Sequence, residues 1–175
     1  MNRAVFLDRD GTITFAPVVD GKPGAPATVE EMTILPGVPE ALKALKAAGF
    51  WLICVTNQPD VSRGKQTLEV VEAMHARLMK ELPLDQIISC YHDDGDNDDC
   101  RKPKPGMLLQ GAREHDIDLK NSFMVGDRWR DIEAGINAGC RTAFIDLHYT
   151  EKQPSTFDVK VGSFGEAAAW ILAGA

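Results

Sequence analysis

The chain has 175 residues, 44% of them hydrophobic, and carries a formal net charge of -7 with a pI of about 5.1. This length suits one compact domain, and the hydrophobic content is enough to form a buried core. A protein this acidic has no general electrostatic attraction for nucleic acid or for an anionic membrane, so we expect neither as a partner.

The sequence also limits where the protein is expected to work. No apolar stretch approaches the roughly 18 residues of a membrane span, and the opening MNRAVFLDRDG does not resemble a secretory signal. We therefore expect a cytoplasmic, monomeric protein with a single domain over 1–175. Because the cytoplasm is reducing, we expect the four cysteines of the chain to be core thiols or metal ligands rather than disulfides.

Short apolar runs alternate with helical patterns along the chain. Strands are predicted at 4–8, 51–57, 86–92, 122–127 and 141–146, with a weaker one at 157–162. Helices are predicted at 36–50, 66–82, 105–117, 130–139 and 164–174. Thr67 is the expected N-cap of the second helix, and Gly49 the expected C-cap of the first. This alternation predicts an α/β fold with a mainly parallel sheet covered on both faces.

Two segments, 14–35 and 93–104, show no clear element. The first is rich in proline and glycine, and the second is rich in aspartate. Both follow predicted strand ends, and ligands of open parallel sheets bind beyond the carboxyl ends of the strands. We therefore expect these two loops to frame a binding site.

Polar side chains lie at the ends of the first, second and fourth predicted strands and in the loop after the third. The set is Asp8, Asp10, Thr56, Asn57, Lys102 and Asp127. Buried carboxylates this close together repel one another unless a cation is present. Mg²⁺ accepts carboxylate and phosphate oxygens, while a lysine and a hydroxyl suit a phosphate group beside the metal. The pattern therefore indicates a magnesium-assisted phosphate site.

Four motifs carry a family resemblance: FLDRDGT (6–12), VTNQ (55–58), RKPKPGM (101–107) and VGDRWRDIEAG (125–135). In order and spacing they resemble the phosphatase branch of the haloacid dehalogenase superfamily, subfamily IIIA. The resemblance covers residues 4 to about 146. It implies a Rossmann-like three-layer sandwich and a covalent aspartyl-phosphate mechanism. The loops are too short for a folded cap domain, so we expect an open site.

The resemblance also assigns roles to the residues that match its motifs. Asp8 would be the nucleophile, and Asp10 the general acid and then the general base. Thr56, Asn57 and Lys102 would hold the transferring phosphoryl group. The expected Mg²⁺ ligands are Asp8, Asp127 and the backbone carbonyl of Asp10, supported by Gly11 at the turn and by Asp131 orienting Lys102 or a metal-bound water.

The segment CYHDDGDNDDC (90–100) predicts a second, structural metal site. Cys90, His92 and Cys100 resemble a zinc clip, here with Asp98 where the related families have another cysteine. These relatives are the D-glycero-D-manno-heptose-1,7-bisphosphate 7-phosphatase family and the histidinol-phosphatase domains. Such a clip would fix the loop that presents Lys102 and its neighbours. The alternative interpretation is a loop whose cysteines and histidine pack without metal.

The resemblance implies a small phosphorylated metabolite as substrate, with a heptose bisphosphate as the specific prediction. Arg101 and Arg128 are candidates for binding a second anionic group, since arginine forks suit phosphate or carboxylate. Histidinol phosphate, another sugar phosphate and a nucleic-acid end phosphate are alternative substrates. A non-catalytic phospho-ligand sensor is the alternative of another class, but it would not need Asp10 as a second carboxylate for proton transfer.

Overall fold

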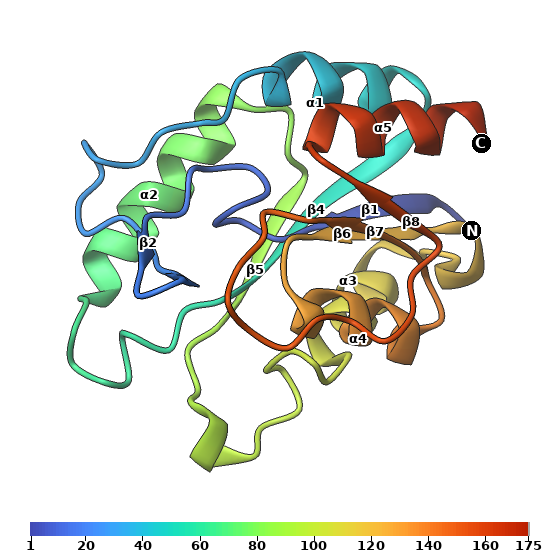
Figure 1. The fold of residues 1–175 in the computed structure, drawn as a ribbon. Coiled ribbons are helices and arrows are strands. Elements are labelled where there is room, and N and C mark those ends of the chain that lie inside the picture. Colours follow the sequence, from blue (N-terminus) through green and yellow to red (C-terminus); the bar gives the residue numbers. More distant parts are fainter. Residues whose placement is uncertain (175) are drawn as a thin grey trace.

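A six-stranded parallel sheet forms the centre of the computed structural model, which describes residues 1–174 (Figure 1). The strands are β1 (Arg3–Leu7), β4 (Phe50–Asn57), β5 (Gln86–Cys90), β6 (Phe123–Gly126), β7 (Arg141–Ile145) and β8 (Val159–Val161). Their spatial order is β5-β4-β1-β6-β7-β8, and every neighbouring pair is parallel. Each strand predicted from the apolar runs is present, so the expected α/β fold is confirmed.

The helices cover both faces of the sheet (Figure 1). One layer holds α1 (Val38–Ala47), α2 (Leu68–Glu81) and α5 (Phe164–Ala173), and the other holds α3 (Gly106–His115) and α4 (Trp129–Ala138). This is the predicted three-layer sandwich. None of the helices in the described part of the chain is long and apolar enough to cross a membrane.

The strands are apolar on both faces because each face packs against a helical layer. In β1, Val5 and Leu7 join the core under α1, α2 and α5, while Ala4 and Phe6 join the core under α3 and α4. These four side chains have no exposed surface. The two-residue period of a strand divides its side chains between two cores, and this explains the continuous apolar runs in the sequence.

Local sequence signals mark two helix ends. The Thr67 hydroxyl accepts a hydrogen bond from the backbone N–H of Val70 at 3.3 Å, which caps the first turn of α2. The C-cap of α1 is Ala48, one residue before the predicted Gly49. Gly49 follows it with φ of +86°, a left-handed conformation that favours glycine. Gly49 thus leads directly into β4, and Thr67 ends the loop that precedes α2.

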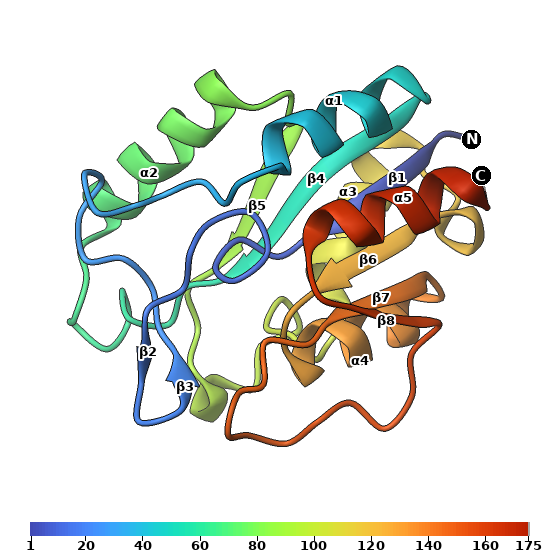
Figure 2. The same ribbon diagram turned by 45° about the horizontal axis from the view of Figure 1, so that its top comes forward.

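The segment 14–35 differs from the expected irregular loop, because it contains a small hairpin. Strands β2 (Val18–Val19) and β3 (Lys22–Pro23) pair antiparallel across a turn at Asp20 and Gly21. Both turn residues have positive φ, 52° and 73°, and Asp-Gly is a strong signal for such a two-residue turn. Figure 2 shows the hairpin beyond the sheet, at the end where β4 and β5 finish. Within the described residues it is the only regular element between β1 and α1, so no folded cap interrupts the domain there.

Two single-turn 3-10 helices complete the described elements. The first, η1 (Asp94–Asp96), lies within the acidic loop after β5, where the sequence predicted no element. The second, η2 (Leu119–Asn121), connects α3 to β6. The Asp93 and Asp96 side chains each accept a backbone N–H from the other end of η1, so the acidic residues themselves organise this turn.

Candidate active site

The carboxyl ends of three adjacent strands bring the predicted catalytic residues together. Asp8 and Asp10 follow β1, Thr56 and Asn57 end β4, and Asp127 follows β6. Because β1 lies between β4 and β6 in the sheet, these distant segments meet at one edge. The edge is therefore where side chains from three of the four sequence motifs can act on one ligand.

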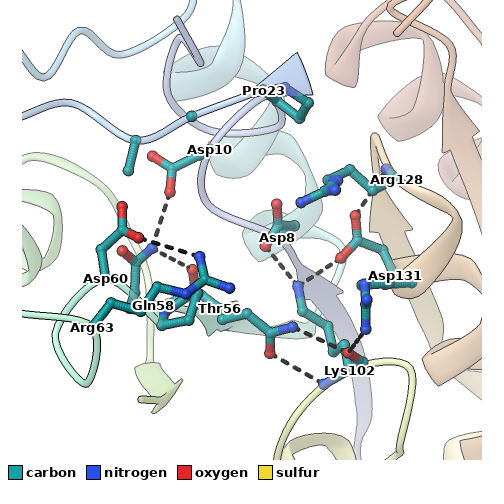
Figure 3. A pocket seen from close by; sticks show the side chains of 15 residues that line it. Asp8, Asp10, Pro23, Thr56, Gln58, Asp60, Arg63, Lys102, Arg128 and Asp131 are labelled. Atoms are coloured by element: carbon teal, nitrogen blue, oxygen red, sulfur yellow. Dashed lines mark hydrogen bonds and ion pairs between the residues drawn. The ribbon is translucent and has the colours of Figure 1, made fainter. Parts of the chain in front are cut away.

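Lys102, from the RKPKPGM motif (101–107), lies at the centre of this cluster. Its Nζ donates to Asp8 Oδ1 and Asp131 Oδ1, each at 2.6 Å (Figure 3). It also donates to the backbone carbonyl of Val55 at 2.9 Å. The lysine is only 2% exposed. Burial by itself would lower its pKa, but the Asp131 and Asp8 carboxylates raise the pKa of Lys102 above its ordinary value. The ammonium is thus a fixed positive charge beside Asp8.

Asp131 is held from both sides. One oxygen accepts from Lys102, and the other accepts the backbone N–H of Arg128 at 3.0 Å. Burial, followed by repulsion from Asp8, raises the pKa of Asp131 to about 6, although Lys102 opposes the shift. The sequence left open whether Asp131 orients Lys102 or a water, and the structure places it directly on Lys102.

The carboxylates around Asp127 have the geometry of a divalent-cation site. Asp8, Asp127 and Asp131 are all buried, and each offers an oxygen within 4.8 Å of the others. Burial and the charges of Asp8 and Asp131 raise the pKa of Asp127 well above its ordinary value. A hard cation such as Mg²⁺ would offset this repulsion and matches the oxygen ligands. The side chains present therefore fit Mg²⁺.

Asp10 faces a different set of partners. Its Oδ2 accepts from Arg9 Nε at 3.1 Å, from Arg9 Nη2 at 2.9 Å and from Gln58 Nε2 at 3.0 Å. Its Oδ1 accepts from the Thr14 hydroxyl at 3.2 Å. Both oxygens are thus hydrogen-bonded, and the carboxylate is held in one orientation at the pocket wall.

Behind Asp10, the Arg9 side chain is completely buried. Its Nη1 lies 3.1 Å from His75 Nε2 on α2. Burial, and then the nearby guanidinium, lower the pKa of His75 to about 4, so the imidazole is neutral near pH 7. His75 Nε2 therefore accepts a hydrogen bond from Arg9 Nη1. Sequence reasoning assigned His75 no role. Its position four residues after Val71, on the inward face of α2, was the available signal.

Residues of the second motif connect the strands to the Lys102 loop. The Asn57 side chain donates to the backbone carbonyl of Lys102 at 3.2 Å and accepts its N–H at 3.1 Å. The Thr56 hydroxyl accepts from Gln58 at 2.9 Å. Asn57 thus fixes the backbone of the loop that delivers the lysine. Gln58 was quoted within the VTNQ motif but was assigned no role.

An open pocket of about 150 Å³ lies above these residues. Asp8, Asp10, Thr56, Lys102 and Asp131 line it, and the turn after β3 forms part of its wall. Three arginines also line it, namely Arg63, Arg128 and Arg130. The concentration of positive charge at the rim suits an anionic substrate larger than one phosphate group. Of these arginines, sequence reasoning identified only Arg128.

The predicted anion-binding arginines are placed differently. Arg128 lies at the pocket and pairs with Glu151, with N···O distances of 2.9 and 2.5 Å. Arg101 is turned toward the acidic loop, where it donates to Asp94 at 2.8 Å and to the His92 carbonyl at 3.2 Å. Arg101 is therefore not among the residues that line the pocket.

Of the proposed zinc ligands, Cys90 ends β5 and the other three lie in the loop that follows. In the structure Cys90 and Cys100 are joined by a disulfide, with their Cα atoms 5.6 Å apart. Cys90, Asp98 and Cys100 each offer a ligand atom within 4.8 Å of the others. His92 is not in that group, but its Nε2 lies 3.5 Å from the Asp98 carboxylate.

This pairing differs from the expectation that all four cysteines would be thiols or metal ligands. Cys90 and Cys100, ten positions apart, lie together as the clip predicted, but their sulfur atoms are bonded to each other. The other two cysteines, Cys54 and Cys140, are buried and free, as expected of small core residues. Burial raises the pKa of Cys140 to about 12, which keeps its thiol protonated.

Comparisons with known proteins agree with this geometry. The profile of the haloacid dehalogenase-like hydrolase family matches residues 25–139. The D-glycero-β-D-manno-heptose-1,7-bisphosphate 7-phosphatase of Helicobacter pylori strain J99 is 37% identical, over 97% of each chain. The corresponding enzyme of Haemophilus influenzae is 41% identical, over 79% of this chain and 78% of that relative.

A solved structure extends the likeness to three dimensions. The D,D-heptose 1,7-bisphosphate phosphatase of B. bronchiseptica, crystallised with magnesium and phosphate, has a TM-score of 0.83. It is 28% identical in sequence, and the match covers 99% of each chain. On these grounds the chain belongs to the haloacid dehalogenase-like hydrolase family, and it is a phosphoric monoester hydrolase of that family.

Proposed function

We propose that the protein removes the 7-phosphate from D-glycero-β-D-manno-heptose 1,7-bisphosphate, with Mg²⁺ and through an aspartyl-phosphate intermediate. The observation that carries this proposal is the buried array at the pocket floor, in which Lys102 links Asp8 to Asp131 beside Asp127. The names of the relatives in H. pylori and H. influenzae support the choice of sugar.

In the first step, an Asp8 carboxylate oxygen attacks the phosphorus atom of the substrate. A bond forms between that oxygen and phosphorus, while the bond from phosphorus to the sugar oxygen breaks. Protonated Asp10 gives its proton to the departing sugar oxygen, which leaves as an alcohol. Lys102 donates a hydrogen bond to Asp8 Oδ1, the carboxylate oxygen that does not attack. Its positive charge stabilises negative charge on the phosphoryl group.

In the second step, a water molecule attacks the phosphorus of the aspartyl-phosphate. Asp10, now a carboxylate, takes a proton from that water, and the bond from phosphorus to Asp8 breaks. Inorganic phosphate leaves, and both aspartates return to their starting states. Thr56, near the pocket floor, and Asn57, which fixes the Lys102 backbone, keep the phosphoryl group in place.

The residues that would hold Mg²⁺ are Asp8, Asp127 and the backbone carbonyl of Asp10. When bound, the ion neutralises the clustered carboxylates and stabilises charge on the phosphoryl oxygens. Asp131 supports the site by fixing Lys102. The positive φ of +90° at Gly11 allows the chain to turn sharply between Asp10 and the rest of the motif.

The second phosphate of the sugar would bind at the arginine rim. Arg128 and Arg130 line the pocket, and each is paired with a carboxylate, Glu151 and Asp94 respectively. A bound phosphate can replace or share these partners, since guanidinium forks bind phosphate in two-point contacts. Arg101, turned toward Asp94, would reach the substrate only after that ion pair opens.

The test is a phosphate-release assay with Mg²⁺ on a panel that includes the heptose bisphosphate, histidinol phosphate, other sugar phosphates, an aryl phosphate and a 5′-phosphorylated DNA end. We expect the heptose bisphosphate to have the highest kcat/KM. Asp8→Asn should reduce kcat by at least about 10⁴-fold, because it removes the nucleophile. Asp116→Asn is the matched control, because Asp116 follows α3 outside the pocket in a left-handed conformation that asparagine also adopts.

The outcome of this panel can contradict the proposal in two ways. Preference for histidinol phosphate or a DNA end would refute the sugar assignment while leaving the phosphatase chemistry intact. A persistent phosphoryl adduct, seen as a stable mass increase without phosphate release, would instead indicate a sensor that does not turn over.

We also propose that Cys90, His92, Asp98 and Cys100 bind a structural Zn²⁺ when the two cysteines are reduced. Their clustering supports this, and the loop they would fix leads directly to Lys102. Protein prepared under reducing conditions should contain about one zinc per chain, whereas Asp98→Ala should lose most of it. Zinc content that is unchanged in Cys100→Ser, or absent from reduced wild type, would refute the site.

A further inference from the structure

Tyr149 lies on the segment between β7 and β8, outside all four sequence motifs. Its side chain is nearly buried, and its hydroxyl donates to Asp127 Oδ2 at 2.7 Å. A neutral donor on a buried carboxylate fixes that group in one orientation. The contact is therefore directed at one of the carboxylates that would bind Mg²⁺.

The other oxygen of Asp127 is held far less firmly. The Thr12 hydroxyl donates to Oδ1 at 3.4 Å, which is long for a hydrogen bond between oxygens. Tyr149 thus makes the shorter of the two side-chain contacts to this carboxylate. Loss of its hydroxyl would leave Asp127 oriented by the weaker partner alone.

The first motif is shaped to accept this pair. A Cβ atom at Gly11 would lie 2.0 Å from Asp127 Oδ2 and 2.9 Å from the Tyr149 hydroxyl. No side chain fits in that space, so only glycine allows Asp127 and Tyr149 to meet against the turn after Asp10. Gly11 is therefore needed for close approach as well as for its positive φ.

Contacts of the two residues that follow Tyr149 hold its segment in place. The backbone N–H of Thr150 donates to the Gly21 carbonyl in the β2–β3 turn at 2.8 Å. Glu151 pairs with Arg128, the residue directly after Asp127. The segment is thus tied to the hairpin at Thr150 and to the start of α4 at Glu151, directly after the tyrosine.

We propose that Tyr149 is a positioning residue that orients Asp127 for Mg²⁺ binding. This inference rests on the proposed magnesium-dependent function. Groups that hydrogen-bond to metal ligands typically change metal affinity by about 10–100-fold when they are removed. The tyrosine does not touch the reacting atoms, so its effect should appear in the binding of the metal rather than in the chemical step.

The experiment is a calorimetric titration of metal-free protein with MgCl₂, for wild type, Tyr149→Phe and Tyr91→Phe. Tyr91 is the chain's other tyrosine; it follows the edge strand β5 and is half-buried. We expect Tyr149→Phe to weaken the Mg²⁺ Kd by about tenfold and Tyr91→Phe to leave it unchanged. Activity of Tyr149→Phe should be low at limiting Mg²⁺ and should recover to the wild-type kcat when the metal is saturating.

A purely structural role would give a different result. It would lower the Tm of metal-free Tyr149→Phe and its kcat at every Mg²⁺ concentration, and this outcome would overturn the inference. A Kd within twofold of wild type would also overturn it, while the proposed function would stand. If wild type itself binds no Mg²⁺, the inference and the proposed function both fail.

A second variant covers the case in which Tyr149→Phe does not fold. Glu151→Gln keeps the tyrosine but weakens the pair with Arg128 that holds its segment. We expect a smaller loss of Mg²⁺ affinity, about threefold, because the Tyr149 contact remains but is less firmly held. An unchanged Kd in this variant would argue against the segment as the source of the orientation.

Discussion

The cluster around Lys102 and the loop around Cys90 and Cys100 both gather charged side chains, but they are held in different ways. Asp8, Lys102 and Asp131 are at most 8% exposed. Asp8 directly follows β1, Asp131 lies in the first turn of α4, and Lys102 is buried between the two. In the loop, the His92 side chain is 50% exposed. Burial within the fold therefore fixes the first region, whereas the second is held by the Cys90–Cys100 disulfide and by surface ion pairs.

The two regions therefore differ in how much their ion pairs contribute to the free energy of unfolding. A charge taken out of water must be paired, so removing one partner from the buried cluster leaves the others uncompensated. An ion pair at the surface gains little, because water and salt already screen its charges. Four measurements can test this contrast, and the largest effect is expected when Lys102 loses its charge.

Lys102→Met removes the cation between Asp8 and Asp131. We expect the free energy of unfolding without Mg²⁺ to fall by about 3–5 kcal/mol, since two buried carboxylates lose their partner. Urea denaturation monitored by tryptophan fluorescence measures it. Lys104→Met, at a more exposed lysine in the same loop, is the control and should change stability little. Equal losses for the two variants would break the comparison.

His75→Ala tests whether the buried region extends behind Asp10. The substitution removes the acceptor for Arg9 Nη1 and leaves a buried N–H without a partner, at a cost of about 1–3 kcal/mol. His75→Gln should recover part of this loss, because its amide oxygen can accept the same proton. Both are measured by urea denaturation, and identical stabilities for alanine and glutamine would argue against the Arg9 contact as the cause.

The raised pKa values in the cluster predict how Mg²⁺ and pH interact. The folded protein holds the Asp131 proton more tightly, with a pKa of about 6 against an ordinary 3.8. Protonated Asp131 therefore stabilises the folded state fully below about pH 3.8, and this stabilisation is lost as the pH rises through about 6. Mg²⁺ should therefore raise the Tm more at about pH 8 than at about pH 5, where protons compete for the carboxylates. Thermal melts with and without Mg²⁺ measure this, and an equal Tm gain at both pH values would contradict it.

Asp94→Asn probes the exposed loop, where Asp94 pairs with Arg101 and Arg130. We expect the free energy of unfolding to change by less than about 1 kcal/mol, and the change to shrink further in high salt. Denaturation curves at low and high salt measure both effects. A loss as large as that of Lys102→Met would show that the loop is as critical to stability as the buried cluster.

Local sequence patterns predicted the helices and strands and the polar residues at strand ends. Apolar runs that alternate with helical patterns predicted six strands and five helices, and each of them is present in the described residues. The sequence also placed Asp8, Thr56 and Asp127 at strand ends, since a strand stops where its apolar run stops. These features could be predicted because they depend on neighbours within a few residues.

Contacts between groups far apart in the chain depend on the tertiary fold. Tyr149, His75 and Gln58 lie outside the roles that motifs could assign, and each acts through a partner that the fold brings to it. Arg101 turned toward the acidic loop for the same reason. Cys90 and Cys100 meet where the sequence predicted shared metal ligands, but a disulfide joins them. A contact between residues far apart in the chain is decided by strand order and loop closure, which no local pattern encodes.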